Sequence, residues 1–549
     1  MRRRARRHRG GKPARLRDRR YWWSGRLNGR AALFAIISGF LGAVGCSAAD
    51  EAADRGPVVE IEAGDLEGVA IDDLSRGAVF RGVPFAAPPT GDNRWRAPQP
   101  ATSWTGVRPA AEFAPACMQG SHIVDWYRGV AGAFGADPGL VDYPNGVSED
   151  CLYLNVWTPD LEPDAPAPVM VWIHGGSYRG GWSYEPNYRG SALAAEGVVV
   201  VSIAYRLGAF GYLAPPGDSY PEGRNFGLLD QIAALEWVQA NVAAFGGDPD
   251  RVTVFGESAG ASSVGTLMTT PAAEGLFHRA ISQSGGFEFV EPHDADTADA
   301  AFAALAQALP DADPRAVSAD AILEASEDVL GDHDFGPVVD GTSLPRHQAE
   351  AVATGALATV PLMIGTNRDE WFMYIDEDSA EATLADYRRR IGGEIDIDAL
   401  VAADGMRGAV DRLETARQMR CPGYRLARRI TELGESSYVY LFTRVRPGDE
   451  AAAFGAYHGA EIPYVFGTHD AWLPTGERDV VLGDAMRALW VSFAASGEAD
   501  AGSAPTWPEF GRTGRVLELG DEIDVIAPFD QEICRALRNA SDAGADGSR

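Results

Sequence analysis

The sequence predicts an α/β fold with a central, mostly parallel sheet and helices on both faces. Two continuous apolar runs, Val169–Ile173 and Val252–Phe255, are predicted to be buried strands, because strands covered on both faces need no polar alternation. Between them, a helical pattern of apolar residues opens at Asn225 and closes at the turn Phe245–Pro249. A strand, a helix and a further strand in this order are typical of a parallel sheet.

A serine stands at the apex of a predicted sharp turn after the second of these strands. Residues Gly256–Gly260 read Gly-Glu-Ser-Ala-Gly, and the small-residue stretch Ala261–Leu267 follows as a helix. This pattern is the nucleophile elbow, in which a tight turn exposes the hydroxyl of Ser258 and glycines let the backbone approach its neighbours closely. Because the pentapeptide would arise by chance about 0.4 times in such a chain, the prediction depends on its context.

A small-residue loop upstream supplies that context. The segment His174-Gly175-Gly176-Ser177-Tyr178 directly follows the strand Val169–Ile173. Backbone amides in such a loop can stabilise an oxyanion. Strand, helix, strand and elbow follow one another in the order of an α/β hydrolase, so the sequence predicts nucleophilic chemistry at Ser258.

Several longer segments resemble the type-B carboxylesterase family, which includes the cholinesterases. These segments are Phe80–Phe85, Asn93–Trp95, Glu149–Val156, Tyr205–Gly211, Phe245–Asp248 and Gly256–Gly260. The likeness runs from about Val58 to about Cys534. It implies an α/β-hydrolase fold with an antiparallel N-terminal part and large insertions, and hydrolysis of carboxylic esters through an acyl-enzyme intermediate. It also implies two internal ion pairs, Arg94–Glu149 and Arg206–Asp230.

The base that would activate the serine must follow an acid later in the chain, since this fold uses the order serine, acid, histidine. Only His458 and His469 lie far enough downstream. The segment around His458 resembles the family's histidine loop, which predicts His458 as the base. His469 lies in a polar turn and is interpreted as a solvated loop histidine.

The acid is expected in the loop after the apolar strand Val360–Gly365, because sites in such sheets form at the carboxyl ends of strands. Spacing alone leaves both Asp369 and Glu370 open. The family resemblance implies Glu370. Trp371 stands where the family usually has a small residue, which could narrow the pocket beneath the triad.

Other residues near the elbow receive roles from their position and from the resemblance. The amides of Gly176, Ser177 and Ala259 are expected to hold the oxyanion, and the family usually has a third glycine where Ser177 stands. Glu257 would sit in the gorge beside the nucleophile and could attract a positive substrate group. Ser284 resembles the family's serine near the acid.

The N-terminal segment is predicted to be a signal for export. Residues 1–45 carry 13 Lys and Arg and one Asp, and an uncharged apolar stretch, Ala31–Gly45, precedes Cys46. Fifteen residues are short for a membrane span, which needs about 20. The segment ending at Cys46 looks like a bacterial lipobox, so Cys46 is the expected lipidation site. Ordinary cleavage near Ala48 or Ala49 is the alternative.

These boundaries define the expected organisation of the chain. A short linker at 46–56 would follow the lipidation site, a single catalytic domain would span 57–538, and 539–549 would form a flexible tail. After processing, the protein would be a membrane-anchored bacterial lipoprotein, either periplasmic or on the cell surface. Alternatively, it would be secreted. The oligomeric state is not indicated.

The net charge of the chain disfavours nucleic acid as a partner. Without the signal segment, 35 basic and 77 acidic residues remain, for a net charge of −42. Such a surface repels nucleic acid, so a role in tracking phosphates is disfavoured.

The four cysteines that remain after Cys46 suit an exported protein with disulfides. The resemblance implies the pairs Cys117–Cys151 and Cys421–Cys534. Four buried free thiols are the alternative.

The expected function is therefore that of a serine esterase acting on a small-molecule ester, with no cofactor and no metal. A non-catalytic, cholinesterase-like binding or adhesion module and an amidase or narrow detoxifying hydrolase remain as alternatives. Aromatic residues near the catalytic segments could line a gorge, although aromatics more often belong to the core; they are Tyr178, Trp182, Tyr184, Phe287, Phe289 and Trp371. The choline-binding tryptophan of the cholinesterases is not recognisable before Cys151, so a dedicated choline esterase is not expected.

Overall fold

The computed structural model describes residues 56–546 except 73, 145, 216–222, 287–291, 312, 449–452, 501 and 503–504, and describes no side chains beyond 540. The chain divides into the units Met1–Gly56 and Pro57–Arg549. The predicted signal segment, Cys46 and the linker up to residue 55 lie outside the described residues, as do Phe287 and Phe289. The description below concerns the second unit.

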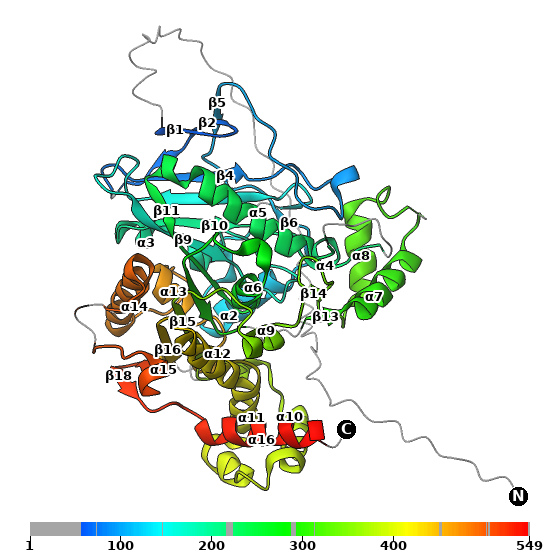
Figure 1. The fold of residues 1–549 in the computed structure, drawn as a ribbon, viewed down its shortest axis with the longest axis vertical. Coiled ribbons are helices and arrows are strands. Elements are labelled where there is room, and N and C mark those ends of the chain that lie inside the picture. Colours follow the sequence, from blue (N-terminus) through cyan, green and yellow to red (C-terminus); the bar gives the residue numbers. More distant parts are fainter. Residues whose placement is uncertain are drawn as a thin grey trace, which may run out of the picture. The chain divides into compact units, whose positions relative to one another are not determined.

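A twisted sheet forms the centre of this unit (Figure 1). Its described strands run in the order β18-β17-β16-β15-β12-β11-β9-β10-β8-β4-β3. The strands are β3 (Val69–Ala70), β4 (Ala78–Pro84), β8 (Tyr153–Thr158), β9 (Ala167–Ile173), β10 (Val199–Ile203), β11 (Gly247–Glu257), β12 (Arg279–Gln283), β15 (Leu362–Asn367), β16 (Ser437–Phe442), β17 (Val516–Leu519) and β18 (Ile523–Ile526). Pairing is parallel from β10 to β17 and antiparallel among β3, β4, β8 and β10. The predicted mostly parallel sheet with an antiparallel N-terminal part is confirmed.

Helices cover both faces of the sheet, and alternate side chains of one strand serve the two layers. In β9, Val169, Val171 and Ile173 join the core beneath one layer, whereas Met170 and Trp172 join the core beneath the other. The first layer contains α5 (Phe226–Asn241), α6 (Ala259–Met268) and α12 (Cys421–Glu432). The second contains α3 (Ser191–Ala195), α13 (Ile462–Phe466) and α14 (Glu477–Ser496). Burial on both faces explains why the central strands are continuously apolar.

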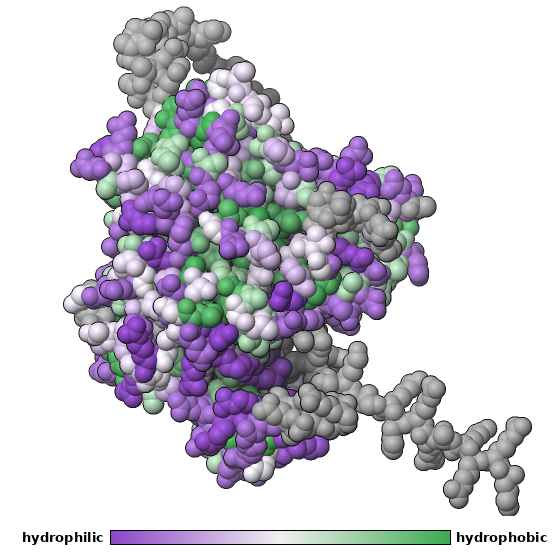
Figure 2. Space-filling view, in the orientation of Figure 1, coloured by the Kyte–Doolittle hydropathy of each residue, from purple (hydrophilic) through white to green (hydrophobic). Residues whose placement is uncertain are grey.

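Two acidic, alanine-rich segments form helical insertions. The first forms α7 (Ala295–Ala308), which packs on α8 (Ala319–Leu330). The second forms α10 (Glu377–Ile391) and α11 (Ile397–Thr415), which continues through the π-helical turn η7 (Ala416–Arg420) into α12. Helices α10, α11 and α16 (Gln531–Asp546) lie together at one end of the unit (Figure 1). Many residues exposed there are hydrophilic (Figure 2).

The chain end differs in one respect from the expected organisation. The domain boundary placed at 538 falls inside α16, which runs on to Asp546. Alanine-rich residues favour continuation of the helix, and Ile533 and Leu537 anchor it in the core formed with α10 and α11.

Shorter elements complete the unit. The remaining strands are β1 (Val58–Ile61), β2 (Gly64–Glu67), β5 (Val107–Pro109), β6 (Ala116–Cys117), β7 (Val147–Ser148), β13 (His293–Asp294) and β14 (Val338–Val339). The remaining helices are α2 (His122–Ala133), α4 (Gly208–Tyr212), α9 (Gln348–Thr354) and α15 (Phe510–Thr513), with 3-10 turns η1 (Gly91–Asn93), η2 (Pro138–Leu140), η3 (Pro186–Tyr188), η4 (Val242–Phe245), η5 (Pro271–Ala273) and η6 (Phe372–Tyr374). Among the described residues, we find no helix with the length and apolar character that a membrane span requires.

Candidate active site

The candidate site lies where parallel strands of the central sheet end. Strands β9, β11 and β15 end at Ile173, Glu257 and Asn367, and the chain leaves each into a loop that carries predicted site residues. Parallel strands bring their carboxyl ends to one edge of a sheet. Topology thus gathers residues that are far apart in the sequence.

The predicted elbow is confirmed as a strand, a one-residue turn and a helix. Ser258 stands between β11 and α6 with φ 58° and ψ −123°, a conformation that costs energy for a residue with a side chain. Its N–H donates to the Gln283 carbonyl at 3.0 Å. A Cβ added to Gly256 would lie 2.6 Å from the Ile173 carbonyl oxygen. The turn therefore needs the glycine on this side.

Gly260 is under the tightest restriction at this turn, and its replacement by alanine is expected to destabilise the fold. The new Cβ would lie 2.0 Å from the Ile173 carbonyl oxygen, a backbone atom that cannot rotate away. Overpacking of this kind costs about 1–3 kcal/mol or more, so thermal melting should show a lower Tm. Gly393→Ala is the matched control, because nothing lies within 4 Å of its added Cβ. An unchanged Tm for Gly260→Ala would contradict the close approach.

The loop after β9 is strained and lies against the elbow. Gly176, Ser177 and Tyr178 have φ values of 102°, 57° and 55°. The Gly176 carbonyl accepts hydrogen bonds of 3.0 Å from the N–H groups of Arg179 and Gly180. A Cβ added to Gly175 would meet the Ser258 Cβ at 3.0 Å. The loop that carries the predicted oxyanion amides is thus adjacent to the serine.

His174 begins this loop and is part of its frame. Its Nδ1 lies 2.9 Å from the Gly175 carbonyl oxygen, and its ring stacks on Tyr205. Burial lowers the pKa of His174 to about 4, so the ring is neutral at pH 7.

Glu370, rather than Asp369, contacts His458. The His458 Nδ1 and the Glu370 Oε2 are 2.7 Å apart, and the other oxygen of this buried carboxylate accepts from the Asn367 N–H at 2.6 Å. Asp369 instead forms an ion pair of 2.8 Å with Arg368 and accepts from the Ala456 N–H at 2.7 Å. Of the two carboxylates that spacing left open, Glu370 is therefore the one that lies against His458.

The other nitrogen of His458 faces the elbow. Its Nε2 lies 3.3 Å from the Oε1 of Glu257, the residue directly before Ser258. Burial opposes the charge on His458, but the Glu257 carboxyl and the hydrogen bond with Glu370 together raise its pKa to about 9. Burial also raises the pKa of Glu257 well above its usual range. The imidazole is thus held between two carboxyl groups.

Glu461 is a site residue that the sequence analysis missed. It is buried and accepts from the Asn367 Nδ2 at 2.7 Å and from the Gln283 Nε2 at 3.1 Å. Burial and the nearby Glu370 raise its pKa. A signal existed, because Glu461 is the one charged residue between His458 and the apolar run Ile462–Phe466.

The structure also shows where Ser284 and the aromatic residues expected near the catalytic segments lie. Ser284 is buried with φ 52°, and its N–H donates to the Gly365 carbonyl at 2.9 Å. Tyr178, Trp182 and Tyr184 are buried in the cores. Trp371 is half-buried, and its ring is nearly parallel to that of His458 at 6.2 Å between centroids.

The interpretation of His469 as a solvated loop residue is wrong. Its ring is half-buried and packs edge-on against Tyr464 at 5.6 Å between centroids. Burial, and then the charges of Arg446 and Arg487, lower its pKa to about 4. Tertiary packing of α13 and α14 covers a turn that is polar in sequence.

The covalent and ionic contacts implied by the resemblance are confirmed. Disulfides join Cys117 to Cys151 and Cys421 to Cys534. Ion pairs join Arg94 to Glu149 at 2.6 Å and Arg206 to Asp230 at 2.7 Å. In the described part of the chain, no group of His, Cys, Asp and Glu side chains is arranged to hold a metal ion.

Comparisons with known proteins agree on one family. Residues 55–405 and 401–536 match the model of the Carboxylesterase family. Fumonisin B1 esterase of Sphingopyxis macrogoltabida is 36% identical over 532 residues, which cover 91% of this chain and 93% of that protein. Para-nitrobenzyl esterase of Bacillus subtilis is 32% identical over 512 residues, which cover 85% and 96%.

Solved structures show the same likeness. A carboxylesterase of Geobacillus stearothermophilus superposes with a TM-score of 0.75 at 31% identity, covering 87% of this chain and 99% of that chain. A para-nitrobenzyl esterase structure superposes with a TM-score of 0.74 at 30% identity, with the same coverage. These neighbours confirm the predicted α/β-hydrolase fold.

Proposed function

The chain belongs to the carboxylesterase family, whose members hydrolyse carboxylic esters, and we propose that it does so with Ser258, His458 and Glu370 as its catalytic triad. One observation carries this assignment. The 2.7 Å contact between His458 and Glu370 lies beside the strained turn that presents Ser258. A base oriented by a buried carboxylate beside a turn that presents a serine hydroxyl is the arrangement that activates a serine.

In the proposed first step, His458 takes the proton of the Ser258 hydroxyl as its oxygen attacks the ester carbonyl. The Glu370 carboxylate stabilises the imidazolium that forms. His458 then gives the proton to the departing alcohol, which leaves Ser258 acylated. Water, deprotonated by the same imidazole, attacks the acyl group and releases the carboxylic acid and the free serine.

The oxyanion of each tetrahedral intermediate would be held by the backbone amides of Gly176, Ser177 and Ala259. The first two lie in the strained loop against the elbow, and Ala259 opens α6. Removal of one such donor in other enzymes costs about 2.7–4 kcal/mol of barrier. The serine at position 177 keeps its amide available, although the family usually has glycine there.

Two rival functions are distinguished by covalent chemistry and by substrates. A non-catalytic binding module would not react with a phosphonofluoridate, whereas the proposed esterase should bind one phosphonyl group covalently per chain. Peptide mass mapping should place the phosphonate on Ser258. An amidase would turn over p-nitroanilides in preference to p-nitrophenyl esters of the same acyl group. Absence of labelling at Ser258 in a protein that turns over esters would overturn the assignment.

Replacement of Glu257 by glutamine is expected to move the acid limb of the pH profile to lower pH. His458 must be neutral to act as a base, and its raised pKa of about 9 places that limb in the alkaline range. Glutamine removes the Coulombic attraction of Glu257, so the pKa of His458 should fall. The profile of kcat/KM for a p-nitrophenyl ester, which reports the free enzyme, measures the shift. An unmoved limb would show that Glu257 does not set the charge of His458.

We propose the cellular location of the protein from its N-terminal residues alone. The basic segment, the apolar stretch Ala31–Gly45 and the lipobox-like residues before Cys46 support a lipoprotein acylated at Cys46. Intact-mass measurement of protein extracted from membranes should show the acyl mass on an N-terminal Cys46. An unmodified N-terminus beyond Ala48 would support the secreted alternative.

A further inference from the structure

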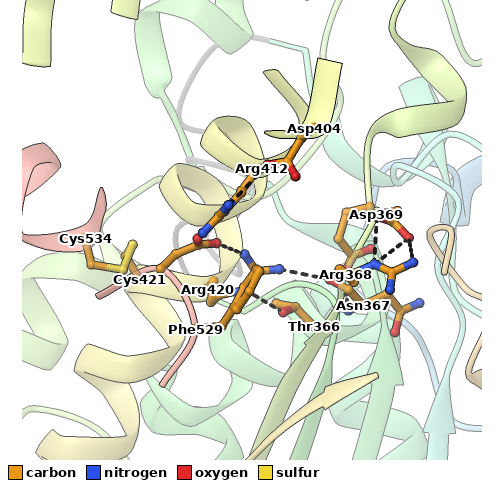
Figure 3. Close-up of polar contacts among 12 residues, drawn as sticks. Thr366, Asn367, Arg368, Asp369, Asp404, Arg412, Arg420, Cys421, Phe529 and Cys534 are labelled. Carbon is orange, nitrogen blue, oxygen red and sulfur yellow. Dashed lines mark hydrogen bonds and ion pairs between the residues drawn. A yellow bond between two sulfur atoms is a disulfide. The ribbon is translucent and has the colours of Figure 1, made fainter. Parts of the chain in front are cut away.

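A buried arginine outside the proposed triad contacts the end of the strand that carries the acid loop. Arg420 closes the π-helical turn η7, and its side chain is buried. Its Nη2 donates to the Asn367 carbonyl at 3.1 Å and its Nε to the Thr366 Oγ1 at 3.3 Å. Figure 3 shows the guanidinium pointing at these two residues. Arg420 therefore holds the last two residues of β15.

The guanidinium is itself fixed from the C-terminal side. Its Nη1 forms an ion pair with Asp530, whose other oxygen accepts from the Arg412 Nε at 2.5 Å. The Phe529 ring lies 5.0 Å from the guanidinium carbon of Arg420 and 4.7 Å from that of Arg412. A buried arginine with its counter-charge and an aromatic face has little freedom to move.

A disulfide ties the same two segments covalently. Cys421 follows Arg420 in the chain, and Cys534 lies one helical turn after Asp530. The Cys534 N–H donates to the Asp530 carbonyl at 2.9 Å. The disulfide therefore links the segment that carries Arg420 to the segment that carries Asp530 (Figure 3).

Asn367 connects this arrangement to the acid and the base. Its N–H donates to the Glu370 Oε1 at 2.6 Å, and its side-chain amide donates to the Tyr457 carbonyl and to Glu461, each at 2.7 Å. Tyr457 is the residue before His458. The position of this one residue, Asn367, therefore affects both the carboxylate and the histidine loop.

We propose that Arg420, held by Asp530 and the Cys421–Cys534 disulfide, is a positioning residue that fixes Asn367 and through it the contact between Glu370 and His458. This inference rests on the proposed function, in which that contact activates Ser258. The Arg420 fork reaches Asp530, Thr366 and Asn367 together. A lysine ammonium is a single point charge, and it cannot reproduce this geometry.

Arg420→Lys is expected to lower kcat by about tenfold to a hundredfold, the range for a small misplacement of reacting groups, with KM changed less than about twofold. Three carboxyl groups face His458: Glu370 from the acid loop, Glu257 from β11, and Glu461 from its own loop. Loosening of Glu370 weakens one of the attractions that hold the proton. The acid limb of kcat/KM should therefore move to lower pH, a shift that a loss of folded protein would not produce.

Arg412→Lys is the matched control. Arg412 contacts the same Asp530 and the same Phe529 ring but reaches Asp404 at 3.1 Å on its other side. It should keep kcat and the acid limb of the unmodified protein. Equal losses of activity in the two variants would overturn the proposal. So would an Arg420→Lys variant whose kcat and whose acid limb of kcat/KM match those of the unmodified protein.

A second variant covers the case in which Arg420→Lys does not fold. Asp530→Asn keeps Arg420 and removes its counter-charge, and it should shift kcat and the acid limb in the same directions. An unmoved limb in folded Asp530→Asn would also reject the proposal. Failure of the triad assignment looks different, because phosphonate labelling would then miss Ser258 in the unmodified protein.

Discussion

Ser258→Ala is expected to reduce kcat for p-nitrophenyl acetate by about 10⁴-fold to 10⁶-fold, the range found when one triad residue is removed elsewhere. Alanine leaves no oxygen to attack the carbonyl, while the loop at Gly176 and the His458–Glu370 contact stay in place. The side chain of Ser258 is small, so Tm should change by less than about 2 °C. Release of p-nitrophenol and a thermal melt measure the two quantities.

Ser262→Ala is the control for this prediction. Ser262 lies one helical turn further along α6 and is also buried. Its replacement by alanine removes a hydroxyl group but leaves the turn at Ser258 unchanged. It should retain turnover within about threefold. Turnover by Ser258→Ala at the rate of Ser262→Ala would remove Ser258 from the mechanism.

His458→Ala is the second large effect, with an expected loss in kcat of about 10⁴-fold to 10⁶-fold. Without the imidazole, no group takes the proton from Ser258, and Glu370 loses its partner at 2.7 Å. The paired variant His469→Ala should keep kcat within about threefold. Steady-state rates of both variants at pH 8 provide the comparison.

The two histidines differ in surroundings, which makes the pair informative. The pKa of His458 is raised by the carboxyl groups of Glu257 and Glu370 after burial has opposed its charge. The pKa of His469 is lowered by burial and by arginines, so its loss removes a neutral ring that packs on Tyr464 and contacts Arg446. A silent His458→Ala with an inactive His469→Ala would show that the base is misassigned.

Part of the fold was predictable because its signals are local. Continuous apolar runs indicated β9 and β11, and glycines around Ser258 indicated a turn that a side chain would obstruct. The strand predicted at Val360–Gly365 was found two residues later as β15, since Pro361 has no N–H to pair within the sheet. Local patterns locate an element better than they locate its ends.

The polar surroundings of the site were less predictable. Glu461 and Arg420 are charged residues in stretches with no motif of their own, and their partners lie far along the chain. Glu370 and His458 are 88 residues apart, and Arg420 and Asp530 are 110 apart. Spacing could not separate Asp369 from Glu370, because both lie in one loop and only the orientation of that loop distinguishes them.

By itself, the sequence determined the α/β fold, the elbow at Ser258, the acidic character of the chain and, through its family resemblance, the two disulfides. Only the tertiary structure decided which carboxylate meets His458, how Glu257 and Glu461 surround it, and how Arg420 reaches the acid loop. The reason is physical. Strands and turns follow from neighbouring residues, whereas buried charges find partners only when parallel strands bring distant loops to one edge of the sheet.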